Sequence, residues 1–243
     1  MTSHLKRKKL KPAAMIMAAG LGTRMRPLTA TRPKPMVELN GQPLIDYALG
    51  KLAVAKISPI VVNVHYLPDI LEHHLKASKL TDVIIADERA ELLDTGGGAF
   101  ANLDVLGPDA FFILNSDSLW IEEGEDNLAA MMTLWDDKRM DCLMLLAPSL
   151  GSLGYSGNGD FNMDTDGCLS RRLPGEKAAH VHTGCCLIHP RVFASAPDGP
   201  FSLNLLWDEI LASGRLFGME LMGQWMHIGT PEALRAAEEK LNP

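Results

Sequence analysis

The chain has few of the features that mark disulfide-stabilised, nucleic-acid-binding or membrane-spanning proteins. Its 243 residues include only four cysteines, and these form neither a CxxC pair nor the spacing of a disulfide framework. A net charge of −7 argues against a general nucleic-acid binder, which needs a basic surface. The apolar run at residues 13–20 is far too short to span a membrane. We therefore expect a cytoplasmic protein with neither nucleic acid nor membrane as a partner.

The scarcity of cysteine also predicts how the four thiols behave. We expect them to be reduced and mostly buried, and because Cys185 and Cys186 are adjacent, a strand would turn them to opposite faces. The basic run within residues 1–12 leads into no long apolar segment, so we expect a flexible tail there. The length suits one large core, and residues 13–243 are expected to form a single domain.

The first half of the chain alternates short apolar runs with amphipathic helical patterns. Helices are predicted at residues 43–56 and 68–77, which both open with proline, and at residues 126–138. Such alternation predicts an α/β fold, with a Rossmann-like, mainly parallel sheet and helices on both faces. The expected strands of this half are residues 13–18, 60–64, 82–86, 110–114 and 141–147.

The pattern changes after Pro148. The following segment is rich in Gly, Ser, Asn and Asp, which predicts turns and a β-hairpin around residues 164–167. Strands are expected again at residues 182–188 and 218–221, and a helix at residues 231–241. The second half is therefore predicted to add a β-rich, substrate-binding insertion to the first.

The most informative segment is AAGLGTRMRPLTATRPKPM, residues 18–36, which follows the first expected strand. Ligands meet open α/β sheets at the carboxyl ends of the strands, so this loop lies where a ligand is expected. Gly20 and Gly22 allow the main chain to approach an anion and to present its N–H groups. The basic side chains of the loop include Arg24, Arg26 and Lys34.

These cations suit a triphosphate whose pyrophosphate must leave. Arg24 can bind phosphate oxygens through two parallel hydrogen bonds, and Lys34 acts as a point charge. A dinucleotide-binding loop fits less well, because Met25 stands at the third glycine position and Asn63 and His65 stand where an acid is needed. The P-loop pattern GxxxxGK[ST] is absent. The remaining alternative is a tight surface turn with solvated basic residues.

The loop resembles the signature of the sugar-1-phosphate nucleotidyltransferases, whose pattern runs G-x-G-[ST]-R-x-x-P-L-T…P-K-P. The resemblance extends through the segments ELLDTGGGAF, ILNSDS, HTGCCLI and WMHIGTPE. The TGGG step and the short length are similar to the members that act on N-acetylmuramic acid 1-phosphate. This resemblance implies a glycosyltransferase-A-like fold, and UTP and a sugar 1-phosphate as substrates.

The resemblance also implies which residues bind the nucleotide and carry the chemistry. Arg24, Lys34 and Asp117 would be catalytic. Asp117 follows an apolar strand and would hold Mg²⁺, although an aspartate there can also simply cap a turn. Either Glu91 or Arg89 could read the base. The residues expected to line the nucleotide site are Ala18, Ala19, Gly20, Gly22, Thr23, Arg24, Glu91, Gly96 and Gly97.

Sugar contacts are expected from the second half of the chain and from Asn115. Arg171 and Lys177 compete with Arg172 for the role of holding the sugar phosphate. In most family members the residue that corresponds to His227 is an aspartate that provides the second metal ligand. Mg²⁺ is the expected cofactor, and Mn²⁺ is the alternative because imidazole suits Mn²⁺ better than Mg²⁺. The expected sugar-side residues are Asn115, Asn158, Asp160, Arg172 and Gly184.

The reaction implied needs no covalent protein intermediate, and no nucleophile motif such as GxSxG is present. The sugar phosphate would attack the α-phosphorus in line, and pyrophosphate would leave. Positioning and charge neutralisation then suffice for catalysis. The alternatives are the same reaction on glucose 1-phosphate, mannose 1-phosphate or phosphocholine, and a nucleotide-sugar sensor without catalytic activity.

Overall fold

A computed structural model describes residues 10–78 and 82–242, and the basic run at the start of the chain lies outside them. The described residues contain a nine-stranded main sheet. Its strands are β1 (Ala14–Met17), β4 (Ile60–Val64), β5 (Val83–Asp87), β6 (Phe111–Asn115), β8 (Cys142–Pro148), β9 (Phe161–Met163), β10 (Leu169–Arg171), β11 (His180–Ile188) and β12 (Leu216–Glu220).

In the main sheet, the strands from the first half of the chain pair in parallel, and those from the second half pair in both directions. The strands follow the order β10-β9-β11-β6-β1-β4-β5, and β8 pairs with both β11 and β12. The pairs β6–β1, β1–β4, β4–β5 and β8–β12 are parallel, whereas β11 is antiparallel to its three neighbours. The α/β architecture predicted from the sequence is confirmed, and the expected hairpin around residues 164–167 is β9–β10.

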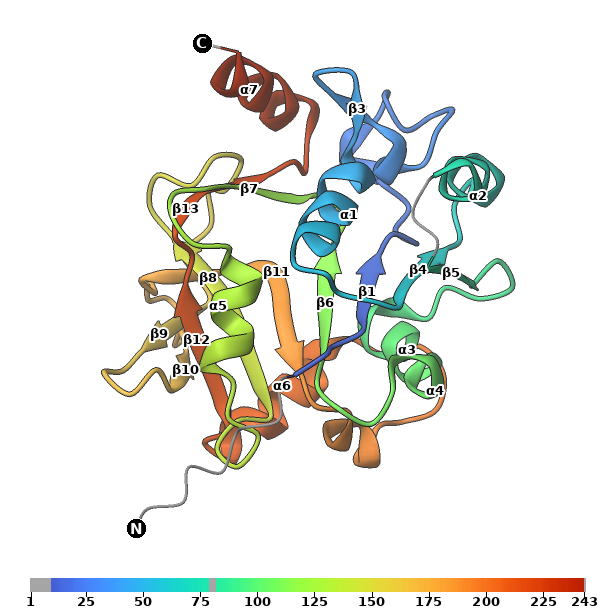
Figure 1. The fold of residues 1–243 in the computed structure, drawn as a ribbon. Coiled ribbons are helices and arrows are strands. Elements are labelled where there is room, and N and C mark those ends of the chain that lie inside the picture. Colours follow the sequence, from blue (N-terminus) through green and yellow to red (C-terminus); the bar gives the residue numbers. More distant parts are fainter. Residues whose placement is uncertain (1–9, 79–81, 243) are drawn as a thin grey trace.

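Two small sheets lie beside the main one. One pairs β2 (Glu38–Leu39) with β3 (Gln42–Pro43), and the other pairs β7 (Ser118–Glu122) with β13 (Gly223–His227). The antiparallel register of the second sheet sets His227 opposite Ser118, which brings the chain after β13 next to the chain after β6 (Figure 1). The sequence had not predicted β7.

Helices cover both faces of the main sheet (Figure 1). One apolar cluster joins the sheet to α1, α2 and α5, and a second joins its other face to α3, α4 and α6. No helix among the described residues is long and apolar enough to cross a membrane. The helices are α1 (Leu44–Val54), α2 (Pro68–Ala77), α3 (Asp94–Phe100), α4 (Leu103–Leu106), α5 (Asn127–Leu134), α6 (Leu203–Ala212) and α7 (Pro231–Leu241), with short 3-10 turns η1 (Thr23–Met25), η2 (Lys34–Met36) and η3 (Pro190–Ser195).

Some predicted boundaries are confirmed and others are not. Strand β4 and helices α2 and α7 have the predicted limits, and the Thr230 hydroxyl caps α7 by accepting the N–H of Ala233. Helix α5 ends at Leu134, four residues early, because Trp135 adopts an extended conformation and is buried. Helix α6 had not been predicted; the Ser202 side chain caps its first turn.

The cysteines are free thiols, as predicted. Three are buried, and Cys168 is half-buried. Cys185 packs in the cluster with α1, and Cys186 packs in the cluster on the opposite face of the sheet. Burial raises the pKa of both Cys142 and Cys185 well above the ordinary value of a thiol.

Candidate active site

The glycine loop turns sharply at the carboxyl end of β1. Gly22 adopts a left-handed conformation (φ 63°), and a Cβ there would lie 3.0 Å from the Thr29 side chain and 3.2 Å from that of Lys34. The Thr29 hydroxyl donates to the Gly22 carbonyl at 2.8 Å. A glycine is therefore required at this position by both conformation and packing. The turn leaves Arg24 exposed, without a hydrogen bond or ion pair to the described part of the chain.

A cavity of about 540 Å³ opens between this loop and the ends of β1, β4 and β6. Because carboxyl ends of parallel strands meet at one edge of a sheet, segments distant in sequence converge here. Most nucleotide-side residues predicted from the sequence lie in its lining. The lining residues are Met17, Ala18, Ala19, Gly20, Gly22, Thr23, Arg24, Met25, Lys34, Pro35, Asn63, Leu92, Asp94, Thr95, Asn115, Ser116, Asp117, Pro200 and Gly229.

The charged centre of the cavity is a half-buried carboxylate beside an ammonium group. Asp117, in the turn between β6 and β7, accepts a short charge-assisted hydrogen bond from Lys34. Burial opposes ionisation of Asp117, but the neighbouring Lys34 and His227 outweigh it and lower the pKa of this carboxyl. Asp117 is therefore ionised at neutral pH.

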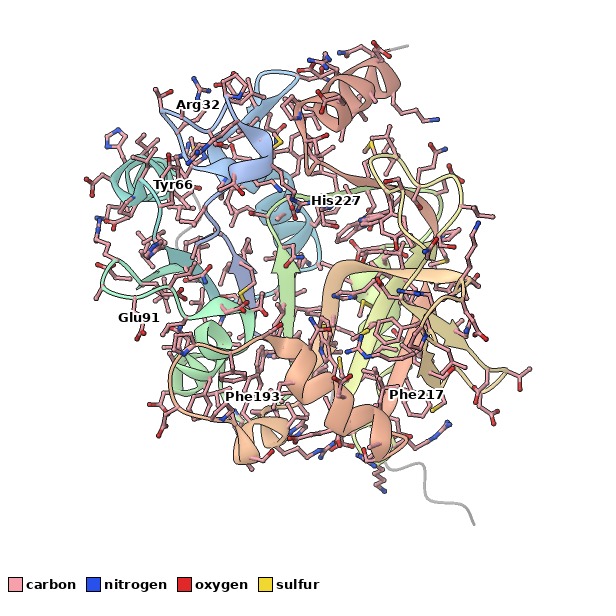
Figure 2. The ribbon with its side chains drawn as sticks, turned by 180° about the vertical axis from the view of Figure 1, so that it is seen from behind. Arg32, Tyr66, Glu91, Phe193, Phe217 and His227 are labelled. Atoms are coloured by element: carbon pink, nitrogen blue, oxygen red, sulfur yellow. The ribbon has the colours of Figure 1, made fainter. Side chains whose placement is uncertain are left out.

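His227, labelled in Figure 2, is the last residue of β13 and lies close to Asp117. Its Nδ1 is 3.9 Å from Oδ2 of Asp117. Burial lowers the pKa of His227, and although Asp117 opposes this effect, Lys34 and Arg24 add to it. The imidazole is therefore neutral at neutral pH. Gly229 makes room for it, because a Cβ at Gly229 would lie 2.6 Å from the His227 Nε2.

The donor set at this point suits one kind of metal ion. Nowhere in residues 10–78 and 82–242 do three or more His, Cys, Asp or Glu side chains gather as a ligand set. Mg²⁺, however, usually takes one or two protein carboxylates and completes its shell with phosphates and water. The half-buried carboxylate of Asp117, with a neutral imidazole beside it, fits that requirement. These residues do not form an all-protein metal cage.

A chain of buried hydrogen bonds fixes the strands next to Asp117 and His227. The Trp225 indole N–H donates to the Ser118 hydroxyl at 2.8 Å, and that hydroxyl donates to the carbonyl of Thr183. The Thr183 hydroxyl in turn donates to the carbonyl of Leu145 at 2.8 Å. Sheet β7–β13, which carries His227, is thus fixed to β11 and β8.

The TGGG step has a different role from the expected one. The three glycines lie inside helix α3, not ahead of it. A Cβ at Gly96 would lie 2.3 Å from the Phe201 ring, and one at Gly97 would lie 2.6 Å from the Gly199 carbonyl. Gly96 and Gly97 are buried and let α3 pack against residues 199–201; the cavity is lined by their neighbours Asp94 and Thr95.

The two residues proposed to read the base lie elsewhere. Glu91 is exposed, lies outside the lining of the cavity, and sits at the edge of the molecule in Figure 2. The Arg89 guanidinium is engaged by three carboxylates, those of Asp69, Glu72 and Asp87. Neither residue lines the cavity, so a base-reading role for Glu91 or Arg89 stays a prediction.

On the sugar side, two predicted residues come together. Gly184 (φ 82°) lies at an irregularity in β11, and a Cβ there would lie 2.7 Å from the Asn115 side chain. The other predicted residues serve the fold. Asp160 accepts the N–H of His182 at 3.0 Å, and Asn158 is exposed, with its carbonyl accepting the N–H of Ala178.

The basic residues of the second half are also structural. Arg172 donates to the carbonyls of Gly159, Leu173 and Glu176. Arg171 bonds Asp208 and Asn204 on α6, and Lys177 is exposed. None of the three lines the cavity, so the expected phosphate contact of Arg172 stays a prediction.

Ten lining positions had not been assigned to the site from the sequence, among them Asn63, Asp94, Thr95 and Pro200. Asn63 was noted only as a departure from dinucleotide-binding loops, and Asp94 and Thr95 are adjacent to the assigned glycines. Pro200 carries no local signal, because it reaches the cavity only through the packing of residues 199–201 against α3.

The fold and the cavity together define the class of protein. Residues 13–150 match the profile of the family described as nucleotidyl transferase. The chain therefore belongs to the nucleotidyl transferase family, and it is a sugar-1-phosphate nucleotidyltransferase. Enzymes of this class make nucleotide sugars from a nucleoside triphosphate and a sugar 1-phosphate.

Individual members of the family are similar to this chain over most of its length. The chain is 44% identical over 232 residues to the N-acetylmuramate alpha-1-phosphate uridylyltransferase of Caulobacter vibrioides, covering 94% of this chain and 96% of that relative. It is 29% identical over 228 residues to the enzyme of the same name from Neisseria meningitidis, covering 93% and 96%. The mannose-1-phosphate guanyltransferase of Hypocrea jecorina is also 29% identical, but only 61% of its length is covered.

Solved structures share the fold at low sequence identity. HddC from Yersinia pseudotuberculosis superposes with a TM-score of 0.74 at 21% identity, over 95% of this chain and 99% of that one. A UDP-glucose pyrophosphorylase from Acinetobacter baumanii gives a TM-score of 0.73 at 17% identity, over 94% and 92%. These likenesses establish the fold.

Proposed function

We propose that this chain transfers a uridylyl group from UTP to N-acetylmuramate 1-phosphate and releases pyrophosphate. The observation that carries the proposal is the meeting of Arg24, Lys34 and Asp117 in one cavity at the end of β1. The choice of sugar and base follows the Caulobacter relative, which the chain matches over nearly its whole length.

The reaction follows from the charges of this cavity. An oxygen of the sugar 1-phosphate forms a bond to the α-phosphorus of UTP, while the bond from that phosphorus to the bridging oxygen breaks. Pyrophosphate leaves with the electron pair. The attacking phosphate is already an anion, so no general base is needed. Arg24 and Lys34 stabilise the negative charge on the phosphoryl oxygens, and the main-chain N–H groups of Gly20 and Gly22 orient them.

The two substrates are proposed to occupy opposite ends of the cavity. The nucleoside would lie between Ala18 and Asn63 on one side and the segment 92–95 on the other. The sugar would lie toward Asn115 and Gly184, where a glycine already brings main chain against a side-chain amide. In this arrangement the phosphates of both substrates meet between Arg24 and Asp117.

We propose Mg²⁺ or Mn²⁺ as the cofactor, held by Asp117 with His227 as the second protein ligand. Members of this family generally depend on a divalent metal. When bound, the ion would neutralise phosphate charge and so favour departure of pyrophosphate. Titrating activity with each metal tests the ligand role of His227: the variant His227→Asp should shift preference from Mn²⁺ toward Mg²⁺. An identical preference in both proteins leaves Asp117 as the sole protein ligand.

We also propose that residues 13–243 act as one catalytic unit in the cytoplasm. The free thiols support this location, because unpaired cysteines are usual in reducing compartments.

A substrate panel tests the proposal directly. Purified protein is incubated with UTP, GTP, CTP, dTTP or ATP and each of several sugar 1-phosphates, and pyrophosphate release is measured. We expect turnover with UTP and N-acetylmuramate 1-phosphate. Turnover only with glucose 1-phosphate, mannose 1-phosphate or phosphocholine would replace the substrate but keep the reaction. Nucleotide binding without pyrophosphate release by any pair would identify a sensor.

A further inference from the structure

Two buried polar residues beside the cavity have no part in the chemistry proposed above. Asn63 on β4 is 3% exposed, and Glu88, directly after β5, is 4% exposed. Polar groups this deeply buried are costly unless each one is hydrogen-bonded. The hydrogen bonds of Asn63 and Glu88 therefore indicate the role of this pair.

The pair forms an unbroken chain of three hydrogen bonds. The Ala18 N–H donates to Oδ1 of Asn63 at 2.7 Å. Because a main-chain N–H can only donate, this bond fixes the orientation of the Asn63 amide. Its Nδ2 donates to Oε1 of Glu88 at 2.8 Å. The other carboxylate oxygen of Glu88 accepts the N–H of Leu93 at 3.2 Å.

Both ends of this chain lie at the cavity. Ala18 and Asn63 line it on the side of the glycine loop, and Leu92 and Asp94, on either side of Leu93, line the facing wall. The chain therefore connects the two walls through groups that are themselves buried.

Two further contacts hold Glu88 in place. Its carbonyl bonds the His65 Nδ1 at 2.7 Å. Helix α3 packs directly on its carboxylate, since a Cβ at Gly98 would lie 2.8 Å from Oε1 of Glu88 and 3.2 Å from Nδ2 of Asn63. The third glycine of the TGGG step is thus needed for the close approach of α3 to this pair.

We propose that Asn63 and Glu88 are positioning residues, which fix the distance between the two walls of the nucleoside end of the cavity. They hold the amides of Ala18 and Leu93 at a set separation, so that the cavity is preformed for its nucleotide. The proposal rests on the proposed function for the identity of that ligand, UTP. It predicts that disturbing the pair weakens nucleotide binding specifically.

The first test is Glu88→Gln, which replaces one acceptor oxygen by a donor of the same size. Either Asn63 or Leu93 then faces an N–H group and loses its hydrogen bond. We expect the Kd for UTP, measured by calorimetry without sugar phosphate, to rise about tenfold, the effect of one lost hydrogen bond. The KM for the sugar phosphate should change by less than about twofold.

The second test restores the chain with reversed polarity. Combined with Asn63→Asp, the variant Glu88→Gln regains every bond: the new carboxylate accepts the Ala18 N–H and the new amide N–H, and the new amide oxygen accepts the Leu93 N–H. We expect the double variant to bind UTP more tightly than Asn63→Asp alone. A control is Asn127→Asp, a buried amide that bonds only the main chain of Met222, which should lower thermal stability without changing the Kd for UTP.

Three results would overturn the proposal: unchanged UTP affinity in Glu88→Gln, an equal loss for both substrates, or additive losses in the double variant. If a single variant does not fold, the double variant decides, because it keeps all three bonds and must fold and bind. Binding is measured without turnover, with whichever triphosphate the wild type binds. A protein that binds nucleotide but releases no pyrophosphate would contradict the proposed function. The binding test of the Asn63 and Glu88 variants could still be carried out on it.

Discussion

Two regions of the molecule both combine glycine turns with arginine and lysine but use these residues differently. They are the glycine loop, residues 18–36, and the outer hairpin region, residues 149–177. In the loop, Arg24 is exposed at the cavity and has no hydrogen-bond partner among the described residues. In the outer hairpin region, Arg172 donates to three main-chain carbonyls.

The difference distinguishes basic residues that are available to a ligand from basic residues that stabilise the fold. A cation without an internal partner is available to an anionic ligand, whereas one that already satisfies carbonyl groups must give up those bonds to act. The glycines follow the same logic. Gly22 shapes a turn at the cavity, while a Cβ at Gly159 would lie 2.3 Å from the Ala178 carbonyl, so that glycine packs the outer hairpin region together.

The largest expected effect concerns the loop cations. Arg24→Ala should raise the barrier to turnover by about 2–4 kcal/mol, because a charge-assisted bond to the reacting phosphates is lost. Its free energy of unfolding should change by less than about 0.5 kcal/mol, since the side chain is exposed. Steady-state kinetics and chemical denaturation measure the two quantities. Arg26→Ala, an exposed residue of the same loop outside the cavity lining, is the control.

Lys34→Ala should lower turnover equally but should behave differently in stability. The ammonium is the hydrogen-bond partner of the half-buried Asp117 and helps to lower the pKa of that carboxyl. Its removal should raise the Asp117 pKa and lower the unfolding temperature. Near wild-type kcat/KM in both Arg24→Ala and Lys34→Ala would mean that the loop is structural, and the contrast with the outer hairpin region would disappear.

The next effect tests whether the TGGG step is a packing device. Gly96→Ala should destabilise the protein by about 1–3 kcal/mol, because its Cβ would overlap the Phe201 ring. Gly50→Ala is the matched control: that glycine also lies in a helix but has nothing within 4 Å of its Cβ, so stability should rise by up to about 1 kcal/mol. Equal responses to both substitutions in thermal unfolding would contradict the packing role.

Arg172→Ala tests the outer hairpin region. We expect a loss of about 1–2 kcal/mol in unfolding free energy, because three carbonyls lose a donor at a half-buried site. The KM for the sugar phosphate should stay within about twofold of wild type. A rise of that KM by tenfold or more without loss of stability would restore the phosphate-binding role predicted from the sequence.

The last expected effect is a pH dependence of stability. Burial lowers the pKa of His182 to about 4, and its Nδ1 has no partner among the described residues. The folded state therefore binds fewer protons than the unfolded state between pH 6.5 and 4, so stability falls as pH drops through this window and is unaffected above it.

Denaturation curves from pH 7 to pH 4 measure this loss. His182→Gln should flatten the dependence across the window. An unchanged slope in that variant would show that His182 is protonated in the folded protein.

How much could be predicted depended on whether a property is local in the sequence. The glycine loop, Lys34 and Asp117 were found because short spacings and strand ends determine them, and parallel strands bring such ends to one edge. The helical conformation of the TGGG step was not predicted, because consecutive glycines disfavour a helix and the packing of Phe201 against Gly96 is a long-range contact.

Properties that depend on long-range contacts could not be predicted. Sequence does not reveal that the polar groups of Asp160 and Arg172 are bonded within the fold. Nor does it reveal that Pro200 and Asn63 reach one cavity from elements more than a hundred residues apart. In each case tertiary packing decides which polar groups remain available to a ligand.

The most direct test of the account is a crystal structure with Mg²⁺ and a UTP analogue that cannot be cleaved between its α- and β-phosphates. We expect the phosphates between the glycine loop and Asp117, with the Arg24 guanidinium on a phosphate oxygen and the metal on the Asp117 carboxylate. Arg172 should keep its bonds to the carbonyls of the outer hairpin region. A nucleotide whose phosphates are bound by Arg172, with Arg24 left in solvent, would contradict the central claim.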